Sequence, residues 1–153
     1  MIAYALDASG FLTGRSSLGA DVSLLVSVLA MALLTAGVVL VRRRHYDAHR
    51  WVQTAAVILN AVLVVIWMFR SLRLYILPGI PGTLSKHGHA LAAVHAATGA
   101  VGVVLGVFVV VSASLLTRRG RSVGRYKTAM RIAYLVYLAG FVLGAWLYVV
   151  TYG

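Results

Sequence analysis

The sequence contains no cysteine and no glutamate, and it has only three aspartates and two prolines. Without cysteine, disulfide bonds and thiolate metal sites are excluded. The aspartates stand far apart in the sequence, at positions 7, 21 and 47, so no pair of carboxylates suggests hydrolase chemistry. A glycine-rich phosphate loop and a nucleophile elbow are also missing, which argues against a hydrolase or a nucleotide-dependent enzyme.

Apolar residues dominate the 153-residue chain, of which 61% is hydrophobic and 11% charged. A water-soluble domain of this size does not need so much apolar material, so the composition predicts an integral membrane protein in contact with the lipid bilayer. A net charge of +11 would suggest nucleic-acid binding in a soluble protein. Here the basic residues gather between apolar runs, which is the positive-inside pattern and requires no nucleic-acid partner.

Four apolar runs are long enough to cross a bilayer as helices, for which roughly 20 residues suffice. They predict an all-α, integral membrane four-helix up-and-down bundle that forms one domain. The predicted spans are residues 22–41, 51–69, 88–116 and 129–150 of a domain over residues 22–152, after a short extramembrane leader at 1–21. Asp21 or Ser23 is expected to cap the first span. Pro78 and Pro81 predict a non-helical loop after the second span, beginning at Arg70.

Two segments, residues 42–50 and 118–127, hold nine of the fourteen Lys and Arg residues. Because positive loops stay in the cytoplasm, both segments are predicted to be cytoplasmic. An even number of spans then leaves both the N- and the C-terminus outside the cytoplasm.

Three histidines, His87, His89 and His95, lie at or just before the start of the third predicted span, which then becomes almost purely apolar. At 3.6 residues per turn, His95 shares a face with small residues, namely Gly88, Ala92, Gly99, Gly102 and Gly106. Small residues let a neighbouring helix approach closely, so His95 is predicted to face protein rather than lipid. An ionisable side chain there suggests a functional contact, and the alternative is a structural hydrogen bond to a neighbouring helix.

Met31 and Met68 are expected at about the level of His95, which should lie about 10 Å below the outer surface by the helical rise. Imidazole with thioether is a plausible ligand set for haem or for Cu(I), since thioethers suit soft copper. Methionine is also a common filler of irregular apolar gaps, so packing is the alternative interpretation.

The other histidines carry weaker signals. His87 and His89 form an H-x-H pair at the outer mouth of the third span, which can bind copper or zinc, although two ligands without a third are more typical of a solvated helix start. His45 and His49 stand among arginines that repel a cation, so His45 is interpreted as an interfacial anchor.

His49 is in line with Gln53, Asn60 and Trp67 on the second span, and this polar face is predicted to look into the bundle. It should lie most of a membrane away from His95, because the two residues belong to opposite ends of their helices.

The order of these features is itself a pattern. VRRRHYDAHRW opens the second span with Ala48-His49-Arg50, a loop with proline and glycine follows, and the third span has an early His before small residues. A basic loop and a last span with small residues and tyrosines complete it. Over residues 22–152 this resembles the small four-helix membrane proteins of the CtaM type. Gln53 stands where that family often has Met, and Gly124–Lys127 where it often has a His-Arg or His-Lys pair.

The CtaM-type family is implicated in making haem-copper terminal oxidases active in prokaryotic plasma membranes. The resemblance therefore implies a non-enzymatic assembly or maturation factor for a haem-copper respiratory oxidase, with oxidase subunits as partners and haem or copper as a cofactor. His49 and His95 match the family's histidines by position. The candidate cofactor-binding residues are His95, His49, Met68 and Met31, and the candidate metal ligands are His95, His89 and His87.

Two other functions stay open. One is a small b-haem electron-transfer membrane protein, which needs two axial ligands at one depth. The other is a cofactor-free structural subunit of a membrane complex. The lack of Asp and Glu inside the predicted spans argues against a proton- or cation-coupled transporter. The glycine faces could serve a homodimer as readily as packing within one chain.

Overall fold

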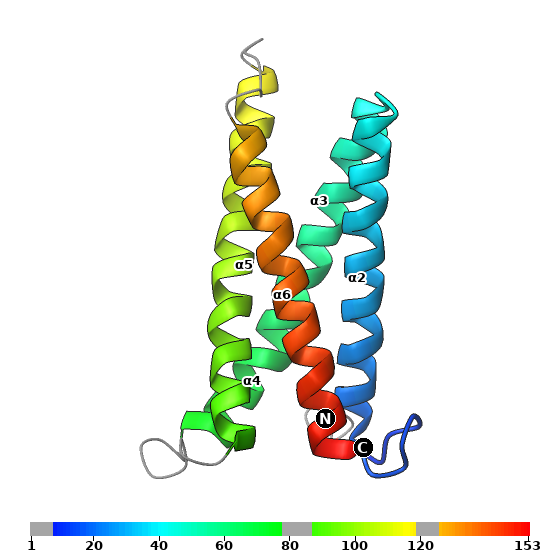
Figure 1. Cartoon of the computed structure of the whole chain (residues 1–153), viewed down its shortest axis with the longest axis vertical. Helices are drawn as coiled ribbons and strands as arrows, with labels where there is room; N and C mark the ends of the chain where they lie inside the picture. The colour runs from blue at the N-terminus through cyan, green and yellow to red at the C-terminus, as the bar shows by residue number, and fades with distance from the viewer. Residues whose placement is uncertain (1–7, 78–86, 119–125) are drawn as a thin grey trace.

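The computed structural model describes residues 8–77, 87–118 and 126–153. The long helices in these residues are α2 (Leu18–Arg42), α3 (Tyr46–Leu63), α5 (His87–Arg118) and α6 (Lys127–Tyr152). Helix α3 continues without a break into three short elements: the π-helical turn η1 (Val64–Met68), α4 (Phe69–Ser71) and a second π-helical turn, η2 (Leu72–Ile76). Four continuous helical stretches are long and apolar enough to cross a membrane. The predicted all-α four-helix membrane architecture is confirmed (Figure 1).

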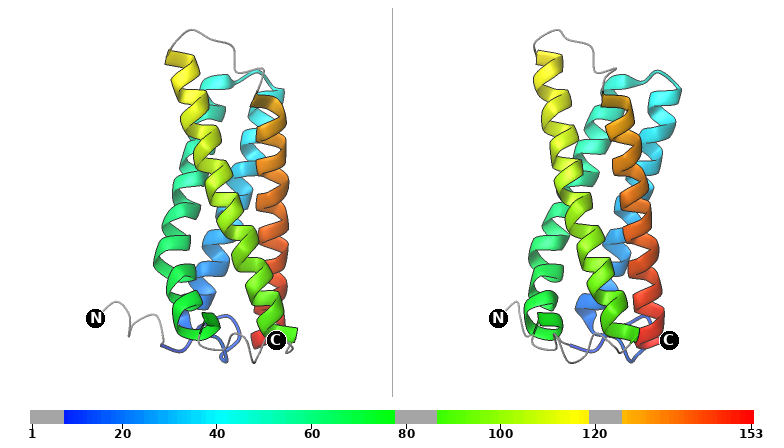
Figure 2. Two further views of the ribbon diagram at one scale, coloured as in Figure 1. Left: turned by 90° about the vertical axis from the view of Figure 1, so that its left-hand side faces the viewer. Right: turned by 60° about the vertical axis from the view of Figure 1, so that its left-hand side comes forward.

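The helices run alternately up and down between two ends of the bundle (Figures 1 and 2). At the basic end, α2 turns into α3, α5 finishes and α6 begins. At the opposite end, which we call the terminal end, α2 and α5 begin and α6 finishes close to the C-terminus (Figure 2). Helix α2 packs mainly on α3, and α5 packs mainly on α6, while the η1 and η2 turns bring the end of the α3 stretch against α5.

The second helix is longer than the predicted span, which stopped at Phe69. The structure stays helical through Ile76, across the residues that the sequence pattern assigned to the start of a loop. Proline disfavours helix only at its own position and at the residue before it, so the apolar residues ahead of Pro78 are free to remain helical. The prolines of the predicted loop lie outside the described residues.

The first helix begins earlier than predicted, because Ser17 caps it. The Ser17 Oγ accepts a hydrogen bond from the Ala20 N–H at 3.2 Å. The expectation that Asp21 or Ser23 caps this helix is therefore wrong: both lie inside it, and the Ser23 hydroxyl donates to the Ala20 carbonyl. An earlier serine satisfies the same unpaired N–H groups at the helix start.

Asp21 instead joins three parts of the terminal end. Its side chain is completely buried. One carboxylate oxygen accepts the backbone N–H groups of Phe11 and Leu12, at 2.6 and 2.8 Å, and the other accepts the Tyr148 hydroxyl at 2.6 Å. We call Asp21, Tyr148 and the Phe11–Leu12 backbone the terminal clasp. It ties the segment before α2 and the last turns of α6 to the first turns of α2.

The half of the bundle toward the basic end, which we call the basic half, is held by close packing and polar contacts between helices. A Cβ atom at Gly37 would overlap the Gln53 side chain, so α2 and α3 touch at this glycine. The Gln53 amide donates to the Leu34 carbonyl at 3.1 Å, as expected for a buried amide in a membrane helix. Helix α5 approaches α6 in the same way, since a Cβ at Gly106 would overlap the Tyr137 hydroxyl.

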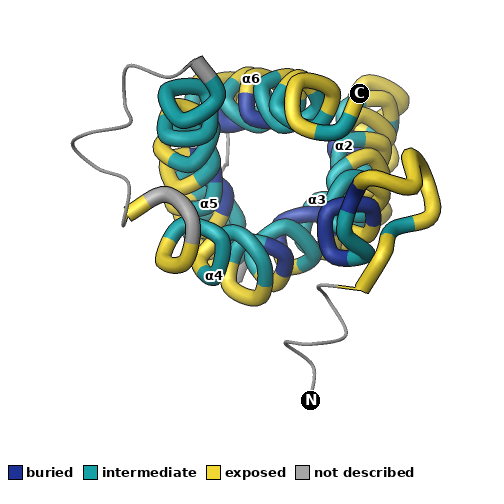
Figure 3. Tube along the Cα trace, turned by 90° about the horizontal axis from the view of Figure 1, so that it is seen from below, coloured by how far each residue is buried: buried dark blue, intermediate teal, exposed yellow. Residues whose placement is uncertain are grey.

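Large apolar side chains cover the outside of the bundle. Val65, Val104 and Trp146 are among the most exposed, at 70%, 68% and 61%. Figure 3 shows the exposed residues on the outer faces of the helices and the buried ones on the faces that point inward. Such an apolar outer surface suits a lipid environment, because exposing apolar side chains to hydrocarbon carries no free-energy penalty.

Candidate cofactor site

A cavity of about 760 Å³ occupies the half of the bundle toward the terminal end, which we call the terminal half. It is lined by all four membrane-spanning stretches. Ser17 and Tyr152, at the ends of α2 and α6, lie at its outer limit, and Leu34 and Val136 lie at its inner limit. The lining along α2, from Ser17 to Leu34, therefore covers about 25 Å at the rise of an α-helix.

His95 lines this cavity from α5. Its Nδ1 lies 3.1 Å from the Gly140 carbonyl oxygen of α6. A carbonyl oxygen can only accept, so Nδ1 carries the proton of this bond. In the neutral ring, Nε2 then keeps a free lone pair, and no hydrogen bond to Nε2 is formed within the described part of the chain. Metal-bound imidazoles are typically oriented in this way, with the second nitrogen donating to a backbone carbonyl.

A glycine on α6 makes room for the imidazole. A Cβ atom at Gly144 would lie 2.7 Å from the His95 Cε1 atom, too close for any side chain. Gly140 thus supplies the carbonyl that accepts the hydrogen bond from His95, and Gly144 leaves the space that the imidazole ring occupies. The predicted contact of His95 with protein rather than lipid is confirmed by this packing.

Met68 and Met31 line the same cavity. Met68 belongs to η1, and its sulfur lies 3.7 Å from the position that a Cβ atom would take at Gly99, one turn beyond His95 on α5. Met31 enters from α2. The structure thus places both methionines and His95 around one cavity, and it puts Met68 within about one helical turn of His95. π-Helical turns such as η1 are frequent at functional sites.

His89 lines the outer part of the cavity, six residues before His95 on α5. His87 is the first residue of α5, and its side chain lies outside the described residues. No cluster of three or more His, Asp or Glu side chains able to hold a metal ion exists among the residues that the structure describes.

His49 does not belong to this site. It sits on α3 near the basic end, and its Nδ1 lies 2.7 Å from the Gly37 carbonyl oxygen of α2. The structure therefore separates His49 from His95, as the helix rise predicts, and gives it a contact between α2 and α3. His45 precedes α3 at the N-cap position, is exposed, and makes no side-chain cap bond.

The predicted polar face of the second span does look into the bundle. Asn60 and Trp67 both line the cavity. Trp67 packs directly on Gly19 of α2, where a Cβ would overlap its ring, and the Asn60 side chain lies beside the Tyr137 hydroxyl. These contacts mark the outer and inner parts of the cavity, and they explain why the polar residues recur at helical spacing.

Sequence reasoning missed the terminal clasp. Asp21 stands within the first helix yet outside the predicted span, and nothing in its neighbourhood of the sequence indicates a contact with Tyr148, 127 residues away. The signal that could have found it is chemical: a lone acid at the start of a membrane span needs several donors, and the terminal tyrosines are candidates.

In comparisons with known proteins, the chain matches no family model, no curated protein and no solved structure.

Proposed function

We propose that this protein is a non-enzymatic assembly factor for a haem-copper respiratory oxidase and that it takes up the metal cofactor, haem or copper, in the terminal cavity. One observation carries the proposal. His95 borders a cavity of about 760 Å³ with its Nδ1–H given to Gly140, so that Nε2 is the nitrogen available to a ligand. The resemblance to CtaM-type proteins supplies the partner, and the cavity supplies a place for the cofactor.

The chemistry of the lining supports carriage rather than catalysis. Its described residues include imidazole, thioether, hydroxyl and amide groups but no carboxylate. The nearby Asp21 carboxylate is fully engaged by three hydrogen bonds in the terminal clasp. Imidazole and thioether are soft or borderline ligands that suit haem iron and copper.

The basic end is assigned to the cytoplasm of a prokaryotic cell, and the cavity to the outer half of the plasma membrane. Support comes from the arginines around the turn from α2 to α3, Arg42, Arg43, Arg44 and Arg50, which lie at the end of the bundle opposite the cavity. Single cysteines at Ser122 and Ser85 test the orientation. An impermeant reagent applied to intact cells should label Ser85→Cys alone, and labelling of Ser122→Cys would reverse the assignment.

The function is tested in cells that lack this protein and make the oxidase. Wild-type protein should restore oxidase activity and the oxidase haem spectrum, and His95→Ala should not, although it inserts normally. His45→Ala is the matched control, because its imidazole is exposed and makes no side-chain cap bond. Full restoration by His95→Ala would contradict the proposal.

A cofactor-free structural subunit is the second candidate, and the hydrogen bond from His95 to Gly140 favours it. His95→Gln separates the two functions. The glutamine amide can still donate to the Gly140 carbonyl, but it ligates haem or copper poorly. A structural role predicts that the glutamine variant restores the oxidase, whereas cofactor binding predicts that it fails.

A further inference from the structure

The cavity is far larger than a single metal ion requires. Its volume of about 760 Å³ lies within the range of about 300–1,000 Å³ that typically encloses cofactor-sized organic ligands. A copper ion held at bonding distance by protein atoms would fill a small fraction of this space. The size of the cavity therefore favours an organic ligand.

The number of possible metal ligands around the cavity also favours an organic ligand over a copper ion. A bare copper ion takes all its ligands from the protein, whereas a haem brings its own ring of nitrogens and needs only one or two axial ligands. His89 and His95 lie about 9 Å apart along α5 and on different faces of the helix, so they do not converge on one ion. The His95 imidazole and the nearby Met68 thioether are enough protein ligands for a haem iron. They are too few for a copper ion that takes all its ligands from the protein.

The distribution of polar groups in the lining also suits an amphiphile. Hydroxyl groups gather toward the terminal end, from Ser17, Thr151 and Tyr152. Deeper in the cavity apolar residues such as Phe141 are accompanied by uncharged polar ones, such as Ser27 and Asn60. A haem has carboxylates on one edge of an otherwise apolar ring, and the hydroxyl groups of the terminal end can donate hydrogen bonds to them.

We infer that the cavity binds haem rather than a copper ion. His95 Nε2 is an axial ligand, Met68 is the adjacent thioether donor, and the carboxylate edge of the ring faces the terminal end. This inference rests on the proposed function and narrows its cofactor to one chemical class.

Haemin and Cu(I) are the probes, titrated separately into the detergent-purified full chain under matched conditions. Haemin should bind saturably with a Soret band typical of axial ligation. His95→Gln should lose more affinity than the roughly 10- to 100-fold that follows loss of an outer partner of a metal site. His49→Gln is the matched control, since His49 also gives its Nδ1–H to a glycine carbonyl but lies at the other end of the bundle. It should bind haemin like the wild type.

A folding defect is separated from ligand loss by chemical rescue. His95→Gly leaves an open space next to Gly144, and added imidazole should restore the Soret band of this variant if the ring is an axial ligand. Met68→Leu should shift the band position while retaining binding, because it removes a thioether and keeps the volume.

Each other outcome has a definite meaning. Equal haemin affinity of the wild type and His95→Gln would overturn the inference, because it would indicate that haemin binds non-specifically to the apolar surface of the protein. Binding of Cu(I) alone, lost in His95→Gln, would overturn the haem assignment and leave the proposed cofactor carriage intact. Binding of neither probe by folded protein would overturn both.

Discussion

His49 and His95 make almost the same hydrogen bond in opposite halves of the bundle. Each gives its Nδ1–H to the carbonyl of a glycine on the neighbouring helix, Gly37 at 2.7 Å and Gly140 at 3.1 Å. Their surroundings differ: His49 lies in the packed basic half, whereas His95 borders the cavity. A histidine between membrane helices is thus not identified as a ligand by burial or by its partner. The cavity distinguishes the two, because His95 lines it and His49 does not.

The two halves are also held together differently. In the basic half, helices touch at Gly37 and Gly106, and Thr35 and Tyr134 join α2 to α6 through their hydroxyl groups at 3.2 Å. In the terminal half the four stretches surround the cavity, Gly19 contacts Trp67, Gly144 contacts His95, and the clasp around Asp21 joins α2 to α6. The terminal half thus adds a buried carboxylate to its glycine contacts, and the described acid of the basic half is exposed, so mutations should affect the halves separately.

The largest effect is expected from Asp21→Ala. It leaves the Tyr148 hydroxyl and the N–H groups of Phe11 and Leu12 without their acceptor. We expect the lowest Tm of all variants discussed here. Amide exchange should accelerate in residues 8–17 and in the last turns of α6, and stay slow around Gly37. Asp21→Asn, which keeps an acceptor oxygen and the shape, is the control and should lose less. A Tm of Asp21→Ala equal to that of the wild type would show that the clasp does not stabilise the terminal half.

Two glycines on α5 give the next comparison. Gly106→Ala places a methyl group on the Tyr137 hydroxyl and should cost about 1–2 kcal/mol, or a fall in Tm of roughly 2–8 °C. Gly99→Ala meets only the Met68 sulfur at an ordinary 3.7 Å, and alanine favours helix by up to about 1 kcal/mol, so its Tm should stay level or rise. Thermal unfolding in one detergent measures both. Equal losses would mean that the terminal half is as tightly packed as the basic half.

Local patterns in the sequence predicted much of this arrangement, because the relevant properties are themselves local. Run lengths predicted four membrane helices, and helical spacing with the rise per residue predicted His95, Met31 and Met68 in one region, where the structure has all three lining one cavity. The π-helical end of the second span was missed, since no residue before Pro78 forces or forbids it. The clasp was missed because it joins residues 127 positions apart, and the cavity because its volume depends on how far two helix pairs separate.

A smaller difference is expected between the two histidines themselves. His49→Ala should cost about 1–2 kcal/mol, because it removes the hydrogen bond to the buried Gly37 and the packing of the ring between α2 and α3, although the Gly37 carbonyl keeps its bond within α2. His95→Ala should cost about 1 kcal/mol or less, since Gly140 borders the cavity and water can take the vacated bond. Chemical denaturation of the two variants in the same detergent, without added cofactor, compares them. A larger loss for His95→Ala would indicate that its environment is as dry and packed as that of His49.

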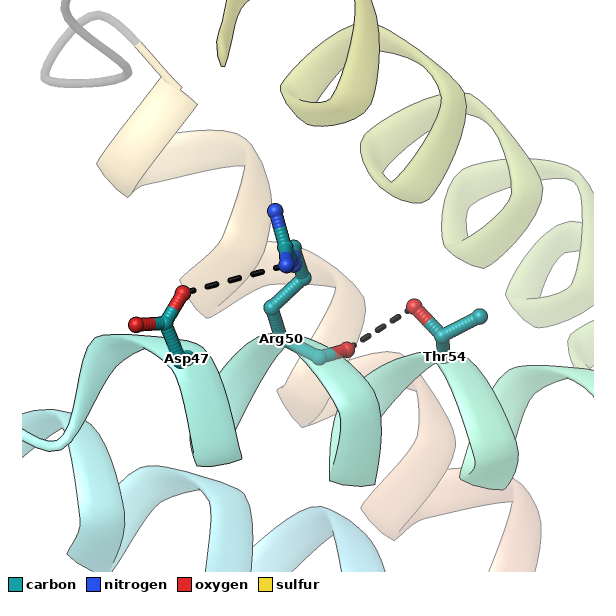
Figure 4. A network of polar contacts seen from close by, with 3 residues as sticks. All are labelled: Asp47, Arg50 and Thr54. Carbon is teal, nitrogen blue, oxygen red and sulfur yellow. Dashed lines mark hydrogen bonds and ion pairs between the residues drawn. The ribbon is translucent and has the colours of Figure 1, made fainter.

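The smallest effect is expected at Asp47, the acid at the basic end. Asp47 and Arg50 form an ion pair at 3.8 Å on the first turns of α3, with 96% and 48% of their side chains exposed (Figure 4). Water and salt screen such a pair, so its net contribution is small. After Asp47→Ala, Arg50 keeps its contact with the Trp51 ring, and Thr54 still donates to the Arg50 carbonyl at 2.8 Å. The Tm should therefore stay within error of the wild type at low and at high salt.

The orientation of the protein in the membrane should not change either, because acids contribute little to the positive-inside rule. A clear, salt-dependent fall in Tm would place Asp47 beside Asp21 as a structural carboxylate, and would remove the contrast between the buried acid of the terminal end and the solvated acid of the basic end.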